Sequence, residues 1–426
     1  SVASRGLGDV YKRQMYRYRQ EGNGASQTAA RRHKPDYWLV ILPTLLTAIG
    51  LIVVFAISPA LSTQKKVAEN YFVYRQLIAV VLSIIFFFLI ANVHYSFWRT
   101  IEKPLIIAAA IAAIAVRLFG EEVNGAYRWI QVGGLSFQAA ELIKFAVLFW
   151  LAGFLASRIQ AGALQKADAI KPIIALILLI GVVVAVIQSD FGSAAVMMAM
   201  IGFMLFVANF PLQKIVIVGA VLLLGGFLVI ATSPYRRQRL QTFAQPAKDC
   251  QAEGYQTCQA LIAVGSGGMF GLGLAKSVQA YGYLPEAAND SIFAIYAEKF
   301  GFIGTSILLG LFLMFFAKIK KVLDRAPDDY SRLLGAGIFA WLVTQSFINI
   351  GAMVGLLPLK GITLPFISYG GTSLIFVASA AALVFNISRY TVLSERINAK
   401  KGTAEYENIA GRRGERRSYY AASGRS

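Results

Sequence analysis

The chain has 426 residues, of which 57% are hydrophobic and only 15% are charged, and its mean hydropathy is +0.59. Soluble domains carry about 25% charged residues, so this composition excludes an ordinary soluble protein and predicts a membrane protein. The net charge of +19 does not require a nucleic-acid partner, because Lys and Arg accumulate on the cytoplasmic loops of membrane proteins. The two His and two Cys residues suggest neither a zinc cluster nor a Ser-His-Asp triad.

The apolar residues form runs close to the ~20 residues that cross the hydrocarbon core of a bilayer. Because a lipid-exposed backbone must satisfy its own hydrogen bonds, each run is expected to be a helix. The pattern predicts an all-α, polytopic integral membrane protein with about ten transmembrane helices. The expected spans are residues 37–58, 72–92, 102–119, 139–157, 170–188, 191–209, 214–232, 291–317, 333–356 and 366–388.

Basic segments set the expected orientation. Arg31–Lys34 precedes the first span, which places the N-terminus in the cytoplasm. Alternation of the spans then places the basic loops around Arg99, Lys166 and Lys318–Arg325 on the same side, together with the C-terminus. Every segment expected inside is net basic, so the charge pattern supports the expected number of helices.

Three regions follow from this topology. They are a cytoplasmic N-terminal extension (1–36), a membrane domain (37–390) and a basic cytoplasmic tail (391–426). Asp9–Gln14 matches the translated end of a sequencing-library transposon. We therefore expect residues 1–14 to be a sequencing artefact, with Met15 as the native start, and exclude them from the fold.

The extracytoplasmic segments are expected at 120–138, 233–290 and 357–365. The loop 233–290 is long and rich in Gly, Pro and polar residues, and loops of such length in a compact fold are usually functional. Cys250 and Cys258 lie in it. A disulfide is the favoured interpretation outside the cytoplasm, and two free thiols are the alternative. Either state would have a structural role.

Ionisable residues within or beside a membrane span are costly and are candidates for function. Glu141 and Lys144 share one face of the fourth span. They form either a functional pair or an ion pair that fixes helix packing. Asp190 lies between two spans and is either functional or a helix cap.

Asp290 directly precedes the eighth span, and Glu286 supplies a second carboxylate nearby. Taken alone, Asp290 suits a helix N-cap better than a catalyst. Carboxylates beside cations would nevertheless suit a substrate with a phosphate group and a hydroxyl to be deprotonated. The cations expected on the same side are Arg128, Arg236, Arg237, Arg239, Lys276 and Lys360.

The glycine-rich run Gly265–Gly273 does not fit a phosphate-binding P-loop. Ala275 stands where that motif needs Gly before Lys276, and no strand is expected before it. We expect a flexible loop or re-entrant segment instead.

Several motifs, in this order, resemble the SEDS family of bacterial cell-wall polymerases, which includes FtsW and RodA. The resemblance covers roughly residues 37–390. The motifs are Asn124–Ile130, Gln138–Lys144, Gln188–Gly192, Tyr255–Gln256, Gly265–Gly268, Tyr283–Glu286 and Leu364–Gly371. Tyr283–Glu286, Leu359–Thr363 and the basic N-terminal extension look more like the division protein FtsW than the elongation protein RodA.

The resemblance implies a SEDS fold and a peptidoglycan glycosyltransferase that polymerises lipid II. The resemblance also implies that this enzyme works with a class B penicillin-binding protein, which is the transpeptidase, and with other divisome membrane proteins. The expected location is the bacterial inner membrane at the division septum. The family's essential aspartate falls on Asp290, which we take as the catalytic base. The expected substrate contacts are Arg128, Glu141, Lys144, Asp190, Arg236, Arg239, Glu286, Lys360 and Ser368.

The chain departs from the family at some positions. Ala139 and Ser189 stand where the family usually has Pro. Ala288–Asn289 replaces a His-Thr pair, and Ser291 replaces Phe, so the details of acceptor binding are open. Mg²⁺ or Mn²⁺ is also left open as a cofactor, because oxygen-ligand sites leave weak sequence signatures.

Alternative functions are a RodA-type elongation polymerase, a lipid II flippase and a non-catalytic divisome scaffold. Buried Glu141, Lys144 and Asp190 would also suit a transport path. A flippase has less reason to place Asp290 at the outer membrane surface, and a scaffold leaves the charged residues unexplained. We therefore expect an enzyme.

Overall fold

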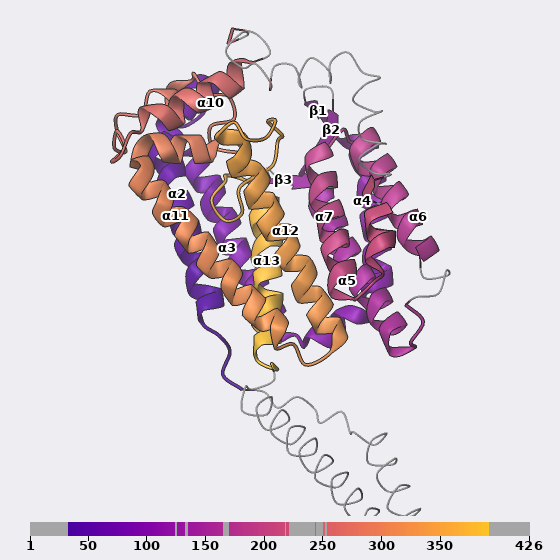
Figure 1. Ribbon diagram of the computed structural model, residues 1–426. Coiled ribbons are helices and arrows are strands. Elements are labelled where there is room, and N and C mark those ends of the chain that lie inside the picture. Colours follow the sequence, from indigo (N-terminus) through magenta and orange to yellow (C-terminus); the bar gives the residue numbers. More distant parts are fainter. Residues whose placement is uncertain are drawn as a thin grey trace, which may run out of the picture. The chain divides into compact units, whose positions relative to one another are not determined.

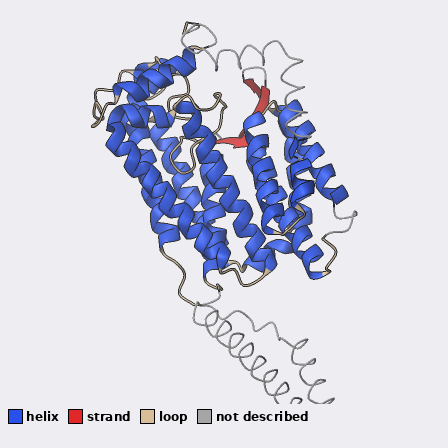
Figure 2. Ribbon diagram, viewed as in Figure 1, coloured by secondary structure: helices blue, strands red, loops and turns tan. Residues whose placement is uncertain are grey.

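Long apolar helices packed side by side make up most of the structure (Figures 1 and 2). The computed structural model describes residues 33–123, 126–132, 135–164, 170–217, 219–220, 243, 250–251 and 254–391. Within these residues, six helices are long and apolar enough to cross a membrane. They are α2 (Trp38–Lys65), α3 (Tyr71–Asn92), α5 (Ala139–Gln160), α11 (Ile292–Asp324), α12 (Asp329–Met353) and α13 (Gly371–Ser388).

Shorter or more charged helices complete the described bundle. They are η1 (Tyr95–Arg99), α4 (Glu102–Phe119), α6 (Ile170–Ile180), its π-helical continuation η3 (Gly181–Ile187), α7 (Phe191–Val207), α10 (Tyr255–Ser266) and η5 (Gln279–Tyr281). Every expected span except 214–232 therefore falls on a helix. That span is helical at 214–217 and 219–220, and the rest of it lies outside the described residues.

Some element boundaries differ from the sequence-based prediction. Lys318–Lys321 were expected in a loop, but α11 continues through them to Asp324. The last span was expected to begin at residue 366, but α13 begins at Gly371. Apolar composition marks the buried part of a helix and does not mark its ends, because charged residues also continue a helix beyond the membrane.

A small antiparallel sheet was not predicted. Strands β1 (Glu121–Val123), β2 (Ala126–Val132) and β3 (Leu135–Gln138) pair in the order β1-β2-β3. Trp129 of β2 pairs with Gln138 of β3, and α5 begins at the next residue, Ala139. The sheet connects α4 to α5 and fixes Arg128, which lies on β2, relative to α5.

The centre of the bundle is formed by α5, α12 and α13. In the most apolar window of α5 and of α13, 78% of the residues are buried, against 22% in α3. Helix α13 packs on α3 and α2, whereas α12 packs on α7, α11 and α5. The exposed apolar faces of the outer helices suit contact with lipid tails. Because lipid tails are as apolar as Leu side chains, the helices at the centre are held together by close packing and polar contacts.

Helix α11 is broken at Gly301, which has φ 63° and ψ −164°. The glycine-rich run bridges the break. Leu272 and Gly273 N–H groups donate to the Glu298 and Lys299 carbonyls, and Phe302 and Ile303 N–H groups donate to Gly268 and Met269. Gly265 and Ser266 end α10, and the rest of the run is a loop, as expected. Its hydrogen bonds replace those that the helix loses and hold it on α11, so the expectation of a flexible segment was wrong.

Buried charges hold the next part of this loop. The Glu298 carboxylate accepts hydrogen bonds from Ser277 Oγ and from the N–H groups of Val278 and Gln279, at 2.5 to 3.1 Å. Lys299 Nζ donates to the Leu274 carbonyl at 2.6 Å. The loop between α10 and η5, residues 267–278, is therefore fixed on the first turns of α11, close in sequence to Asp290.

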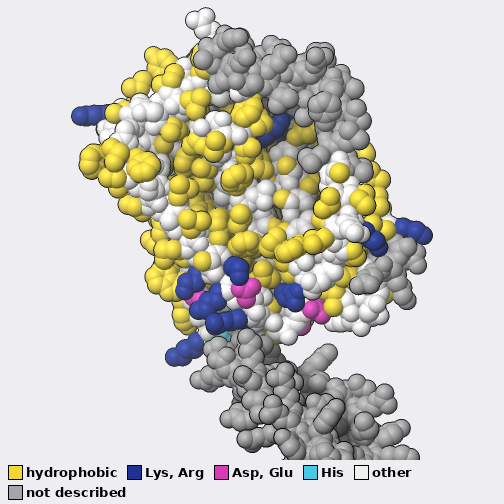
Figure 3. All heavy atoms as spheres, viewed as in Figure 1, with side chains coloured by type: hydrophobic (Ala, Val, Ile, Leu, Met, Phe, Trp, Pro, Cys, Tyr) yellow, Lys and Arg dark blue, Asp and Glu magenta, His cyan; other side chains and the backbone are white. Residues whose placement is uncertain are grey.

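Lys and Arg side chains gather at the end of the bundle opposite α10, below a broad apolar band (Figure 3). Lys318 forms an ion pair with Asp36 there, at 3.5 Å. Residues 35–388 form one compact unit. A second unit consists of residues 1–34 and 389–426, and within its described part His33 Nε2 hydrogen-bonds the Thr391 carbonyl at 2.9 Å.

Candidate active site

Arg128 is held at one end of the bundle by main-chain carbonyls. Its Nε donates to the Gln188 carbonyl at 3.2 Å, and Nη2 donates to the Ser189 carbonyl at 2.6 Å. Both acceptors belong to the turn between η3 and α7. Two of the guanidinium nitrogens are thus used for anchoring, which leaves Nη1 to face the loop between α12 and α13, residues 354–370.

Asp290 lies in the turn that leads into α11, and its main chain is fixed from α12. Asn349 Nδ2 donates to the Asp290 carbonyl at 2.7 Å. The side-chain Oδ1 atom is buried and has no hydrogen-bond partner among the described residues. A buried acceptor without a partner is costly and is rarely kept for stability alone.

Asp290 and Arg128 meet at Gly361 in the α12–α13 loop. A methyl group on Gly361 would lie 3.6 Å from Asp290 Oδ2 and 3.7 Å from Arg128 Nη1. The carboxylate and the guanidinium therefore line the same small space. Lys360, the preceding residue, places its Nζ 5.5 Å from the centre of the Phe191 ring. Segments far apart in sequence thus bring a carboxylate and a guanidinium to Gly361, and Lys360 is the residue before it in the chain.

Burial raises the pKa of Asp290 to about 7, the nearby Glu286 carboxylate adds to this rise, and Arg128 opposes it. An ordinary Asp has a pKa near 3.9. Glu286 itself is exposed in a backbone conformation with φ 49°, and its carboxylate accepts a hydrogen bond from Asn289 Nδ2. A carboxylate with a pKa near neutrality can take up and release a proton at the pH of the cell.

Glu141 and Lys144 form a buried ion pair. Lys144 Nζ lies 2.8 Å from Glu141 Oε1, and both side chains are almost completely buried. Lys144 Nζ also donates to Gln345 Oε1 at 3.2 Å and lies 4.8 Å from the centre of the Trp341 ring. The pair fixes α5 to α12, as the packing alternative expected, and Gln345 links it to the α12–α13 loop.

Asp190 is the N-cap of α7. Its Oδ1 accepts from the Ser193 N–H at 2.9 Å, and its Oδ2 accepts from Ser193 Oγ at 2.7 Å and from Gln138 Nε2 at 3.4 Å. The capping alternative therefore describes Asp190 in this structure. Because the neighbouring Ser189 carbonyl binds Arg128, the cap also fixes the turn that holds the guanidinium.

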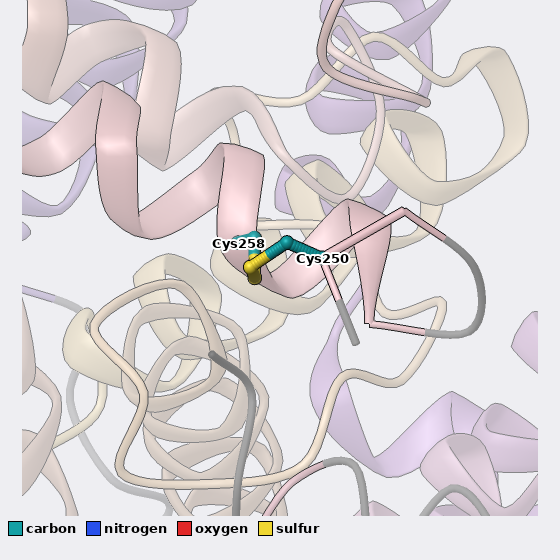
Figure 4. Close-up of a disulfide and its surroundings, with 2 residues drawn as sticks. All are labelled: Cys250 and Cys258. Carbon is teal, nitrogen blue, oxygen red and sulfur yellow. A yellow bond between two sulfur atoms is a disulfide. The ribbon is translucent and has the colours of Figure 1, made fainter. Parts of the chain in front are cut away.

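Ser368 is buried, and its hydroxyl accepts a hydrogen bond from the Leu364 N–H at 2.7 Å. The hydroxyl serves the turn that precedes α13, so the geometry gives no support to the expected substrate contact at Ser368. Arg236 and Arg239 lie outside the described residues. Cys250 and Cys258 are joined by a disulfide at the start of α10, with Cα atoms 5.6 Å apart (Figure 4).

In the described part of the chain, no three His, Cys, Asp or Glu side chains gather in a way that would hold a metal ion. Glu286 and Asp290 are two nearby carboxylates, and Mg²⁺ is usually held by one or two carboxylates together with waters and phosphate oxygens. A role for Mg²⁺ or Mn²⁺ stays a prediction.

Two amides of α12 were missed by sequence reasoning. Gln345 and Asn349 are four residues apart, on one face of the helix, and both are buried. An amide inside a membrane span needs hydrogen-bond partners, just as a charged group does. Two amides four residues apart in an apolar run therefore indicate a polar contact on one helix face, and this pattern could have predicted both residues. No sequence pattern predicts a role for Gly361, because that role depends on Asp290 and Arg128, which only the fold brings beside it.

The fold and the site define a helical membrane protein with a carboxylate and a guanidinium beside one loop at the end of its bundle. The family model for the FtsW, RodA and SpoVE cell cycle proteins matches residues 37–393. The chain belongs to this family.

Curated relatives and a solved structure agree with this assignment. Stage V sporulation protein E of Bacillus subtilis is 36% identical, over 85% of this chain and 99% of its own. The "Probable peptidoglycan glycosyltransferase FtsW" of Saccharophagus degradans is also 36% identical, over 83% of this chain and 92% of its own. A chain from a peptidoglycan synthase complex matches with a TM-score of 0.68 and 27% identity, covering 83% of this chain and 98% of its own.

Proposed function

We propose that the chain is a peptidoglycan glycosyltransferase that polymerises lipid II into glycan strands. The observation that carries the proposal is the meeting of Asp290 and Arg128 at Gly361. Two relatives are named "Probable peptidoglycan glycosyltransferase FtsW", and this chain matches more than nine tenths of the length of each. A base and cations around one small space are the groups that such a transfer needs.

In the proposed reaction, the 4-hydroxyl of the acceptor sugar attacks the anomeric carbon of the donor. The bond from that carbon to the diphosphate oxygen breaks, and the polyprenyl diphosphate leaves with the bonding electron pair. Attack from the face opposite the α-linked diphosphate gives the β-1,4 linkage. Asp290 takes the hydroxyl proton as general base, while Arg128 and Lys360 stabilise the negative charge that develops on the leaving diphosphate.

The orientation follows from charge. Lys and Arg gather at the end of the bundle opposite α10 (Figure 3), which is the distribution expected of a cytoplasmic face. In the proposal, Asp290 and the disulfide-bonded segment at α10 are therefore extracytoplasmic, where a disulfide can persist.

The cellular setting belongs to the proposal as well. The enzyme acts in the bacterial inner membrane at the division septum, beside a class B penicillin-binding protein and other divisome membrane proteins. Similarity to a peptidoglycan synthase complex and to FtsW relatives supports this setting. A fluorescent fusion found along the side wall would instead favour a RodA-type role in elongation.

The decisive experiment supplies lipid II in detergent, where no bilayer has to be crossed. We expect the purified chain with its partner transpeptidase to form long glycan strands, and the partner alone to form none. A lipid II flippase would form no strands in detergent but would move lipid II across the bilayer of a vesicle. That pair of results would overturn the proposed function.

A further inference from the structure

One face of α12 carries three buried polar side chains at intervals of four residues: Trp341, Gln345 and Asn349. Their exposed fractions are 0%, 1% and 1%. Polar groups at this depth often hold neighbouring helices together. Here, however, the two amides bind the main chain of the segments that form the site. Gln345 and Asn349 are called the amide clamp below.

Asn349 joins two segments of the site. Its Nδ2 donates to the Asp290 carbonyl at 2.7 Å and to the Ile362 carbonyl, also at 2.7 Å. An amide nitrogen has two protons to donate, so both are used. The two carbonyl acceptors also fix which way the amide points. If the amide were flipped, its oxygen would face both carbonyl oxygens and no hydrogen bond could form.

Gln345 repeats this arrangement one turn away. Its Nε2 donates to the Thr363 carbonyl at 2.9 Å and to Thr363 Oγ1 at 3.3 Å. Its Oε1 accepts from Lys144 Nζ at 3.2 Å and from Trp341 Nε1 at 2.7 Å. The clamp therefore holds the successive carbonyls of Ile362 and Thr363, directly after Lys360 and Gly361.

We propose that Gln345 and Asn349 are positioning residues, which set the distance between Asp290 and the Lys360–Thr363 segment for the transfer reaction. The inference rests on the proposed function. It gives the Glu141–Lys144 pair an indirect part in the reaction, because Lys144 orients the Gln345 amide so that its nitrogen faces Thr363. Gln345 and Asn349 themselves bind main chain and leave the reacting groups to Asp290, Arg128 and Lys360.

The test compares Asn349→Leu with Asn386→Leu. Asn386 is the matched control: it is equally buried, donates to the Ala91 carbonyl at 2.8 Å and accepts from the Tyr95 N–H at 3.0 Å, away from the site. Both variants lose a buried amide that binds main chain. We expect similar falls in unfolding temperature, but only Asn349→Leu should lower kcat for lipid II polymerisation, by about 10²-fold, with KM within about threefold.

Gln345→Glu is the second variant, for use if Asn349→Leu does not fold. It keeps an acceptor for Lys144 and Trp341, replaces the donor to Thr363 by an oxygen, and adds an acidic group beside Lys144. We expect a folded protein whose kcat falls at least about tenfold and whose pH midpoint of kcat shifts. Gln345→Met should show the fall in kcat as well.

The outcomes separate this inference from the proposed function. Loss of kcat in the clamp variants, with Asn386→Leu active, supports positioning. Equal loss of kcat in Asn386→Leu, or unchanged kcat in the three clamp variants, would overturn it while leaving the polymerase intact. An inactive wild-type protein with its partner would overturn the proposed function itself, and the inference with it.

Discussion

Asp290 and Arg128 approach the same point of the α12–α13 loop, with Asp290 Oδ2 3.6 Å and Arg128 Nη1 3.7 Å from the place where Gly361 would carry a methyl group. One comes from the turn before α11 and the other from β2. A base and a cation held this way can act on two parts of one substrate, the hydroxyl that loses its proton and the diphosphate that leaves. The absence of a side chain at Gly361 keeps the space between them open.

Gly361→Ala should therefore lower polymerisation without unfolding the protein. The added methyl group would make ordinary van der Waals contacts, so the unfolding temperature should change little. It would occupy the space between the carboxylate and the guanidinium, and a misplacement of about 1 Å can cost about 10²-fold in rate. Glycan formation and thermal unfolding are the two measurements. Full activity in Gly361→Ala would show that substrate does not enter this space.

The raised pKa of Asp290, about 7, predicts a pH dependence. A general base must be ionised, so the rate should rise with pH through about 7 and level off above about 8. Glu286 raises this pKa, so Glu286→Gln should move the midpoint to lower pH. Initial rates of lipid II polymerisation across pH 5.5 to 9, on a ~0.5-unit grid, give the midpoint. A rate that is flat over this range would exclude Asp290 as the titrating base.

The sequence predicted the helices better than the site. Apolar runs identified every described span because length and hydropathy decide membrane insertion. The break at Gly301 and the three strands were not predicted, because both depend on partners distant in sequence. Asp290 was selected by resemblance, and taken alone it was better explained as a helix cap. What places it in a site is the Asn349 amide on α12, which only the folded structure brings near.

The Glu141–Lys144 pair gives a stability prediction. Lys144→Met would leave the Glu141 carboxylate buried beside no cation, and breaking a buried pair by removing one partner costs about 3–5 kcal/mol. The double variant Glu141→Gln/Lys144→Met removes both charges and should recover much of this loss. Unfolding in a graded detergent series measures both. A double variant less stable than Lys144→Met would contradict the expectation.

Two glycines of α11 should respond differently to alanine. Gly301 has φ 63°, and a methyl group there would lie 2.3 Å from the Gly271 nitrogen, whereas one on Gly310 would meet nothing within 4 Å. The strained backbone alone costs about 1–3 kcal/mol. We expect Gly301→Ala to destabilise the protein and release the glycine-rich loop to protease, while Gly310→Ala behaves as wild type. Equal protease resistance in the two variants would be incompatible with the bridged break.

The most direct test of the account compares Asp290→Asn with wild type in lipid II polymerisation, alongside thermal unfolding at pH 8. The folded-state pKa of Asp290 lies above the usual value, so ionisation lowers the stability of the folded state as pH rises from about 4 to about 7. Asn removes that cost, and the variant should unfold at the same temperature as wild type or higher. We predict a stable, membrane-inserted protein that forms no glycan strands. Glycan synthesis by Asp290→Asn at the wild-type rate would show that Asp290 is not the general base.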